Sequence, residues 1–365
     1  MKTFEGEKID GSSPPSVFIG RKGYPNVFIG PLIPPVHGDT SLMDTPEKWA
    51  DKGAGDIIDF RFQLVRGKQL VNVNDKSRIT GMVREIALSK NPLDIDAAFS
   101  KKPRGSFFNE DVQPFGPSAP IKTMEIGNVK FEHHLERAYY DTDLLAREAV
   151  LSLYTQGLFV STIQKAFSVG AFGLKENRKL VPTRWSITAV DSTLSENHLE
   201  NVRHYPLIDT FRVYEAENIN NRFVILLLPT EWKYETMEAW FPSVIGDRLE
   251  IYGDWEGHDK KKDYAAIGGC YYAARLAVAE QLEKERKQAG VIIFRESYPG
   301  YIPLGVWNVR ENVRQAMQRF REFESLNEAL TYVSSRVKIP MQQWILGSRL
   351  LKETITQRRL SDFAK

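Results

Sequence analysis

Residues 213–228, VYEAENINNRFVILLL, hold the pattern on which the fold assignment depends. The runs 213–214 and 223–228 are rich in β-branched and aromatic residues, which favour strands. A third such run, VIIFR, occupies 291–295, just after a stretch with helical periodicity over 264–288. Three more helices are expected near 308–321, 325–337 and 341–356. Strands and helices do not alternate as in a doubly wound sheet. The pattern predicts an α+β fold with mixed sheet elements, a helical C-terminal part and a flexible C-terminal peptide.

The first 55 residues repeat a short apolar motif. Val17-Phe18-Ile19-Gly20 returns as Val27-Phe28-Ile29-Gly30, so we expect two short buried strands joined by a tight loop. Apolar and polar residues alternate over 59–73, which predicts a hairpin, and residues 77–88 are typical of a helix. Two further helices are expected over 141–156 and 161–168.

Composition and cysteine usage bear on the compartment. The chain has 365 residues and a mass of 41.7 kDa, with 42% hydrophobic and 26% charged residues. No run approaches the ~20 apolar residues of a membrane span, and the first ten residues lack the apolar core of a signal peptide. The single cysteine, Cys270, excludes an internal disulfide and a thiolate-rich zinc site. We therefore expect a cytoplasmic location and no membrane partner.

Charge balance limits how this chain can bind nucleic acid. Its 49 Lys and Arg residues against 47 Asp and Glu residues give a net charge of +2. Because phosphate neutralisation needs a local surplus of cations, coating DNA by charge alone is not expected. Basic runs do occur, although most such runs are solvated faces: 260–262, 319–321 and 358–359.

The last nine residues, QRRLSDFAK at 357–365, have the pattern of a docking peptide. In one turn of 3₁₀ helix, residues three apart eclipse each other, so Leu360 and Phe363 would form a two-pronged apolar plug. The side-chain amide of Gln357 would lie beside them, free to find backbone partners. This pattern resembles the peptide by which replication and repair proteins bind the sliding clamp (PCNA), the ring that encircles DNA. The usual form has a second aromatic residue where this chain has Ala364, which predicts weaker docking.

An alternative is that these nine residues simply complete the last helix. The apolar stripe of that helix would continue at Arg358 or Arg359. Leu360 and Phe363 fall off the stripe, as a separate recognition element would.

The most unusual internal segment is RKLVPTRWSITAVD at 178–191. Three cations and a tryptophan precede a short apolar stretch that ends on an aspartate. Arg184 and Trp185 would supply a charge and a stacking surface for a nucleotide or an unpaired base. The candidate ligand-binding or nucleic-acid-binding residues of this segment are Arg178, Lys179, Arg184 and Trp185.

A second candidate binding element is the loop inside the repeated motif. Its backbone N–H groups and the glycines at positions 20, 23 and 30 would let a phosphate approach closely. The loop lacks the spacing of a known phosphate-binding loop, since neither GxxxxGK[ST] nor GxGxxG occurs. Its candidate ligand-binding residues are Arg21, Tyr24 and Asn26.

Three residues are candidates for catalysis. His37-Gly38-Asp39, directly after a proline-rich loop, places an acid near an imidazole, as general acid–base chemistry requires. Asp191 either belongs to such a pocket or caps a helix that runs on through Leu199.

Metal-dependent phosphodiester cleavage would need several carboxylates converging on Mg²⁺ or Mn²⁺. Glu231, Glu235 and Glu238 share one face if their segment is helical. Asp254 and Glu256 form a second, strand-like acidic pair. Glutamate is a common helix former, so solvent-facing acids explain the same pattern, and no metal ligand is assigned.

Four segments together resemble the archaeal Nre family of DNA repair proteins. They span nearly the whole chain: GYPNVFIGPL at 23–32, FGPSAP at 115–120, VPTRWSITAVD at 181–191 and PLGVW at 303–307. The clamp-binding tail stands where that family also carries one. Some relatives carry an N-terminal cysteine-rich zinc element, whereas this chain has no cysteine before Cys270. The resemblance implies an N-terminal α+β domain over 1–250, a mostly helical domain over 251–356 and a clamp-binding tail over 357–365.

Three functions follow from these observations. The resemblance implies a factor in DNA damage repair that binds DNA and works with the sliding clamp. The alternative is an enzyme on damaged nucleic acid or nucleotides, either a metal-dependent nuclease or a hydrolase of nucleotides or nucleosides, with Arg184, Asp191 and His37 in the pocket. The third is an interaction scaffold with no nucleic-acid contact. The family offers no settled catalytic mechanism, so the sequence leaves enzymatic activity open.

Overall fold

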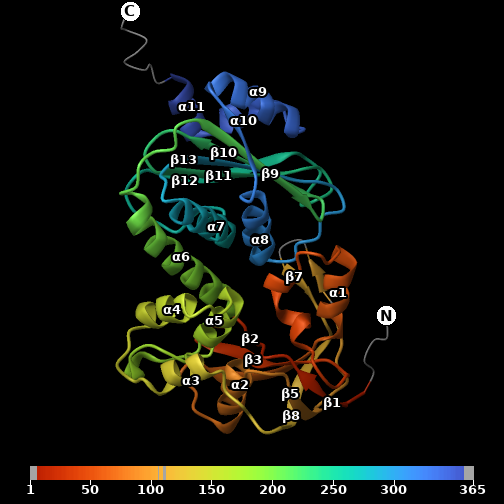
Figure 1. Ribbon diagram of the computed structural model, residues 1–365. Helices are drawn as coiled ribbons and strands as arrows, with labels where there is room; N and C mark the ends of the chain where they lie inside the picture. Colours follow the sequence, from red (N-terminus) through yellow and green to blue (C-terminus); the bar gives the residue numbers. More distant parts are fainter. Residues whose placement is uncertain (1–5, 106, 110–111, 357–365) are drawn as a thin grey trace, which may run out of the picture. The chain divides into compact units, whose positions relative to one another are not determined.

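The chain divides into two compact units, and the long helix α6 (Thr183–Val202) belongs to both (Figure 1). The computed structural model describes residues 6–105, 107–109 and 112–356. The first unit comprises Met1–Leu194 and Pro303–Gly305, and the second comprises Ser195–Ile302 and Val306–Lys365. The expected clamp-binding residues, Gln357 to Ala364, lie outside the described part of the chain.

The first unit is built on a six-stranded sheet in the order β1-β5-β8-β4-β3-β2, in which only the β4–β8 pair is parallel. Its strands are β1 (Lys8–Ser13), β2 (Val17–Ile19), β3 (Asn26–Ile33), β4 (Val65–Asn72), β5 (Leu93–Phe99) and β8 (Ser118–Ile126), and a separate ribbon pairs β6 (Phe107–Asn109) with β7 (Val112–Phe115). The helices are α1 (Ala54–Gln63), α2 (Arg78–Leu88), α3 (His133–Tyr140), α4 (Ala146–Thr155) and α5 (Val160–Ser168), with 3₁₀ turns at Ser41–Asp44, Pro46–Lys48 and Lys175–Asn177.

The two faces of this sheet differ along β3 and β4, and the difference determines where a ligand can bind. Val27, Ile29 and Val65 are buried, and helix α2 packs against β2 and β3. Phe28 and Leu70 stand opposite each other in the antiparallel ladder but are 43% and 53% exposed. Since successive side chains point to opposite faces of a strand, one face forms core and the other carries apolar groups open to solvent.

The second unit has a six-stranded sheet in the order β12-β11-β13-β10-β9-β14 between two layers of helices (Figure 1). Strand β13 (Gly290–Ser297) is parallel to β11 and antiparallel to β10, and all eight of its residues are buried. Helices α7 and α8 cover one face, and α9 to α11 cover the other. The bounds are β9 (Phe211–Asn218), β10 (Asn221–Leu228), β11 (Lys233–Trp240), β12 (Glu250–Glu256), β14 (Phe320–Phe323), α7 (Gly269–Glu285), α8 (Val306–Ala316), α9 (Leu326–Arg336), α10 (Met341–Gly347) and α11 (Arg349–Thr356).

Two expectations, the fold class and the pairing of the repeated motif, are confirmed by this architecture. Both units combine sheets with helices that do not alternate regularly with the strands, so the fold is α+β. The repeated motif forms β2 and the first part of β3, which pair as an antiparallel hairpin. No helix in the described part of the chain is long and apolar enough to cross a membrane.

The hairpin expected over 59–73 is wrong. Its first half is the end of α1, and only the second half forms a strand, β4. The Asp56 carboxylate accepts the Gly53 N–H at 3.1 Å and so starts a helix upstream of the alternating residues. A period-two pattern over so few residues was overridden by this local cap and by packing.

The helix expected for Glu231, Glu235 and Glu238 is also wrong. Glu235 and Glu238 lie on strand β11, three positions apart, and therefore point to opposite faces of the sheet. The last expected helix, 341–356, is divided at Ser348 into α10 and α11. Asp191 does not cap a helix, because α6 already begins at Thr183, eight residues earlier.

Candidate nucleic-acid interface

The loop between β2 and β3 is held in a tight turn by its own backbone. The Asn26 N–H donates to the Gly23 carbonyl at 2.9 Å, and Gly23 has a φ of 82°, a conformation that glycine adopts without steric cost. The side chains of Asn26 and Asn72 join the loop to the end of β4 by a hydrogen bond of 3.1 Å. The loop therefore presents Tyr24 at a defined position, 41% exposed.

The segment at the start of α6 is joined to the same hairpin by hydrogen bonds, directly at Ile19 and indirectly through Val73. The Leu180 N–H donates to the Val73 carbonyl at 2.8 Å, and the Val73 N–H donates to the Pro25 carbonyl at 2.9 Å. The Thr183 hydroxyl oxygen accepts the Ile19 N–H at 2.9 Å. Two sequence segments more than 150 residues apart thereby become one surface.

The aromatic rings of Tyr24 and Trp185 meet on this surface. Their centroids are 5.0 Å apart with planes tilted by 52°, and Trp185 is 45% exposed. Such large rings are usually buried, so a pair left open to solvent indicates a surface on which a ligand can stack. The candidates Arg21, Lys179 and Arg184 are exposed nearby in the chain.

Arg178 has a different environment from the other candidate cations. Its guanidinium donates to the carbonyls of Gly173, Tyr139 and Asp141, with distances of 2.7 Å and 2.6 Å to the first two. These bonds satisfy its donors inside the fold, so Arg178 holds the chain before α6 in place.

The three candidate catalytic residues do not share one site in their described contacts. The ion pairs of His37 are with Asp10 at 3.4 Å and Asp94 at 3.3 Å, at the exposed edge of β1 and β5. Asp39 accepts the Ser41 N–H at 3.0 Å. Asp191 is buried in α6, where its carboxylate accepts a hydrogen bond from the Gln164 amide at 2.9 Å.

The acidic residues of β11 are used to hold the second unit together. Glu235 accepts hydrogen bonds from the Ser348 hydroxyl, from the Arg349 N–H at 2.7 Å and from the Leu350 N–H at 3.0 Å. It thereby satisfies backbone donors at the start of α11. Glu238, on the opposite face, forms an ion pair of 2.6 Å with Arg295.

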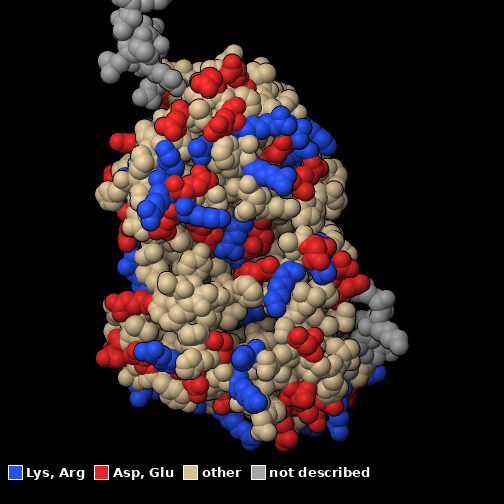
Figure 2. Space-filling view, viewed as in Figure 1, with Lys and Arg blue, Asp and Glu red and all other residues tan. Residues whose placement is uncertain are grey.

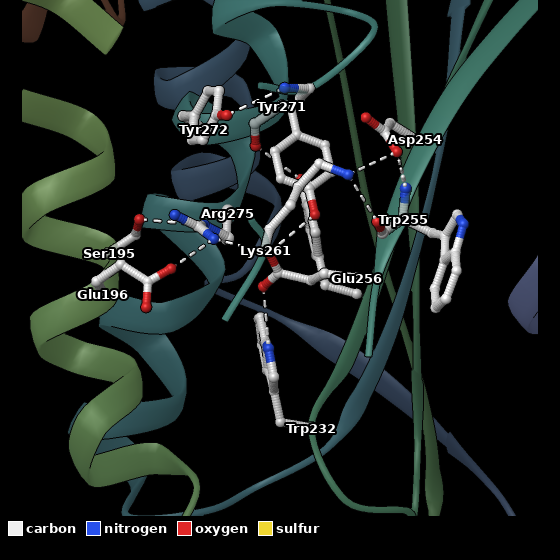
Figure 3. Close-up of polar contacts among 12 residues, drawn as sticks. Ser195, Glu196, Trp232, Asp254, Trp255, Glu256, Lys261, Tyr271, Tyr272 and Arg275 are labelled. Carbon is white, nitrogen blue, oxygen red and sulfur yellow. Dashed lines mark hydrogen bonds and ion pairs between the residues drawn. The ribbon is translucent and has the colours of Figure 1, made fainter. Parts of the chain in front are cut away.

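Asp254 and Glu256 belong to a buried polar cluster beneath α7 (Figure 3). Glu256 accepts from Trp232 at 3.1 Å, from the Tyr271 hydroxyl at 3.0 Å and from Arg275 at 2.7 Å. Asp254 binds the Lys261 ammonium at 2.9 Å and accepts the Ala266 N–H at 2.8 Å. Both carboxylates are engaged by protein donors. Within the described residues, no group of three or more His, Cys, Asp or Glu side chains is placed to hold a metal ion.

Phe28 and Leu70 extend the exposed apolar surface along β3 and β4, and neither is among the site residues predicted from the sequence. Their alternation with buried neighbours is a sequence signal for the exposed face of a strand. The repeated motif by itself, however, predicts two buried strands. The face of the protein seen in Figure 2 carries Lys and Arg interspersed with Asp and Glu. This mixture agrees with the small net charge.

Taken together, the first unit has an exposed aromatic pair with three exposed cations close to it in sequence, on an α+β framework. Aromatic rings and cations are the groups that stack a base and contact its phosphate. The protein-family model described as "Archaeal Nre, N-terminal" matches residues 1–245. The family model described as "Archaeal Nre, C-terminal" matches residues 256–363. The chain belongs to the archaeal Nre family. These two matches meet near residue 250, whereas the compact units divide near residue 195.

Three relatives match over most of their length. The chain is 43% identical to "DNA repair protein NreB" of Archaeoglobus fulgidus, over 97% of this chain and 91% of the relative. It is 38% identical to "DNA repair protein NreA" of the same organism, over 89% and 84%. It is 31% identical to "DNA repair protein NreA" of Haloferax volcanii, over 93% and 86%. No solved structure matches the chain significantly.

Proposed function

We propose that this protein is a DNA repair factor that binds DNA through the first unit and is recruited by the sliding clamp. The observation that carries the DNA-binding part is the exposed Tyr24–Trp185 ring pair, close in sequence to Arg184 and Arg21. The names of the relatives support the repair role. Stacking on aromatic rings favours unpaired bases, so single-stranded or distorted DNA is the expected ligand.

Recruitment is assigned to the tail at 357–365. Burying one leucine and one phenylalanine on the clamp contributes about 3–6 kcal/mol. Ordering the peptide on binding offsets much of this gain. A ring with several identical sites, already on DNA, compensates by raising the effective concentration. Affinity in the micromolar range is therefore sufficient.

The DNA-binding proposal is tested with single-stranded oligonucleotides and the full-length chain. Trp185→Ala removes the stacking surface and is expected to weaken binding by about 1–3 kcal/mol, and Arg184→Ala is expected to weaken it with a shallower salt dependence. Tyr252→Ala and Arg248→Ala, at other exposed positions, are the matched controls. Unchanged affinity in Trp185→Ala, with the control variants also unchanged, would remove this surface from the proposal.

The clamp-binding proposal is tested by titrating a sliding clamp with the wild type, a deletion of 357–365 and two point variants. Phe363→Ala removes half of the apolar plug and is expected to abolish measurable binding. Ser361→Ala changes the same peptide outside the plug and is expected to bind as the wild type. Equal binding by Phe363→Ala and the wild type contradicts the tail's role.

Glu235 and Glu256, two of the acidic residues considered for metal-dependent cleavage, accept hydrogen bonds from protein donors, which favours a binding factor over a metal-dependent nuclease. A screen of oligonucleotides and nucleotides with Mg²⁺, with Mn²⁺ and without metal separates the two. Cleavage of an oligonucleotide or nucleotide by the purified wild type, lost in Trp185→Ala, would show that the protein is an enzyme rather than a binding factor.

A further inference from the structure

Arg66 on β4 lies between two aromatic rings. The guanidinium carbon is 4.5 Å from the ring centroid of Phe18 and 4.0 Å from that of Phe115. Contacts of this kind with two rings stabilise the cation and restrict the orientation of its plane. The in-plane N–H donors are then the groups left for hydrogen bonding, in a rigid fork that matches phosphate.

Close backbone contacts put Phe115 in this position. The Arg66 N–H donates to the Pro117 carbonyl at 2.8 Å, which holds the 115–117 loop against β4. A Cβ added to Gly116 would lie 2.4 Å from the Leu64 carbonyl oxygen, so the approach requires glycine. The segment FGPSAP at 115–120 has no part in the Tyr24–Trp185 surface. It places the ring of Phe115 against Arg66.

The Arg66 guanidinium has no counter-ion within the described residues. No described carboxylate or carbonyl accepts a hydrogen bond from it, and its Nε atom is buried without a partner. Arg61, whose charge acts on Arg66, is itself paired with Asp44 at 2.5 Å. Burial, together with the charge of Arg61, lowers the pKa of Arg66 to about 10. Leaving a buried donor without a partner costs free energy, and an anion bound here would supply the missing acceptor.

Neighbouring side chains add like charge rather than neutralising it. Lys68 is two positions along β4, on the same face as Arg66. Burial lowers the pKa of Lys68, and the charges of Arg66 and Lys101 lower it further. Among the described residues no carboxylate pairs with Arg66 or Lys68, and like charges in proximity repel one another, a cost that an anionic ligand would reverse.

The same sheet face continues toward the proposed stacking surface. Residues 66, 68 and 70 of β4 share this face, and Leu70 stands opposite exposed Phe28. Asn72, at the far end of β4, is bonded to Asn26 of the Tyr24 loop. Six residues of strand separate Arg66 from that loop, which is about 20 Å. This is a length that a short single strand can follow.

We infer that Arg66, held between Phe18 and Phe115 and supported by Lys68 and Lys101, binds a phosphate group, and that the phosphate comes from the backbone of a DNA strand whose bases stack near Trp185. The inference rests on the proposed DNA-binding function. A mononucleotide or inorganic phosphate would present the same chemistry to the guanidinium.

The test uses the full-length chain with three probes: a single-stranded oligonucleotide, a nucleoside monophosphate and inorganic phosphate. Arg66→Met removes the charge and keeps a long apolar side chain between the rings. Loss of a charged hydrogen-bonded pair is expected to weaken oligonucleotide binding about 10-fold or more. Inorganic phosphate is expected to raise the Tm of the wild type and not that of Arg66→Met.

Two further variants serve as references. Lys90→Met removes one exposed cation elsewhere in the same unit and is expected to behave as the wild type. Arg66→Lys keeps the charge without the planar fork and is expected to bind between the wild type and Arg66→Met. If Arg66→Met is misfolded, as judged by its Tm without ligand, Arg66→Lys carries the test.

The outcomes separate this inference from the proposed function. Unchanged affinity for all three probes in Arg66→Met, with weaker DNA binding in Trp185→Ala, overturns the phosphate site and leaves DNA binding intact. Weaker binding of phosphate and mononucleotide only, with DNA binding absent from the wild type, supports the site and overturns DNA as the source. Absence of binding to every probe in the wild type overturns both.

Discussion

Two arginines in this protein differ in what balances their charge. In the second unit, Arg295 is 1% exposed and paired with Glu238 at 2.6 Å, and its other donors reach Asn221 at 2.9 Å and the Tyr301 hydroxyl at 3.0 Å. Arg66 in the first unit has rings around it but no acceptor among the described residues. The first arrangement is typical of a structural ion pair, and the second indicates a site for a ligand.

The buried ion pair between Glu238 and Arg295 predicts that a conservative substitution lowers stability strongly. Glu238→Gln keeps the shape of the side chain but leaves the Arg295 charge uncompensated, which is expected to lower the free energy of unfolding by about 3–5 kcal/mol. Urea denaturation followed by circular dichroism measures this loss. Glu231→Gln, at an exposed position two residues before β11, is the control and should leave stability within experimental error.

His37 predicts a pH dependence at the exposed edge of the first sheet. The hydrogen bond to Asp94 and the charge of Asp10 raise the pKa of His37, so folding favours its protonated form. Its contribution to stability is fully present below the ordinary histidine pKa of 6.5 and is lost as pH rises through the higher value in the folded protein.

Titration of the His37 ring by NMR should therefore give a midpoint above that of an unstructured peptide. Asp94→Asn removes the largest cause of the shift and should move the midpoint back down. A His37 midpoint that is the same in Asp94→Asn and in the wild type would contradict the ion pair.

At the scale of elements, glycines determine how closely loops approach strands. Gly116→Ala is expected to destabilise the first unit by about 1–3 kcal/mol, because the added methyl group meets the carbonyl oxygens of Phe62 and Leu64 at the end of α1 and forces the loop away. The same displacement would move Phe115 off Arg66, so phosphate should raise the Tm of this variant less than that of the wild type.

Gly81→Ala is the matched control and should have the opposite sign. Gly81 lies inside helix α2, where an added Cβ meets nothing within 4 Å. Replacing glycine by alanine in a helix interior stabilises by about 1 kcal/mol. The Tm of both variants tests this difference. A lower Tm for Gly81→Ala would contradict the claim that close contact with the backbone constrains Gly116 but not Gly81.

For the whole molecule, the net charge of +2 predicts a modest dependence of DNA binding on salt. Log affinity for a single strand should fall with log salt concentration at about 0.7 per phosphate contacted. The cations proposed to contact DNA are few, so the slope should be shallow compared with that of a protein that coats DNA. Arg66→Met should reduce it by about 0.7, as one contact fewer. A steep slope that Arg66→Met leaves unchanged would indicate a different, more extensive basic surface.

Some local patterns in the sequence predicted their elements correctly, and others did not. The periodicity over 264–288 became α7, and the repeated motif became the β2–β3 hairpin. The alternation over 59–73 predicts a hairpin, but a helix cap at Gly53 makes its first part helical. The spacing of the glutamates over 231–238 predicts a helix, but pairing with β12 and β13 makes this segment a strand.

The candidate site divides in the same way. The sequence alone identified both Tyr24 and Trp185 as candidates. A loop with several glycines, and a tryptophan next to cations, can be recognised from residue types along the chain. Nothing in the sequence indicated that Arg178 donates to three internal carbonyls or that Arg66 lies between two rings. Those facts depend on which segments meet in space.

The sequence by itself determined the fold class and the family, because both depend on residue types and spacings along the chain. Only the tertiary structure decided which cations are neutralised and which are left without an anion. Charge compensation acts over a few ångströms between residues far apart in sequence, and no local pattern encodes those distances.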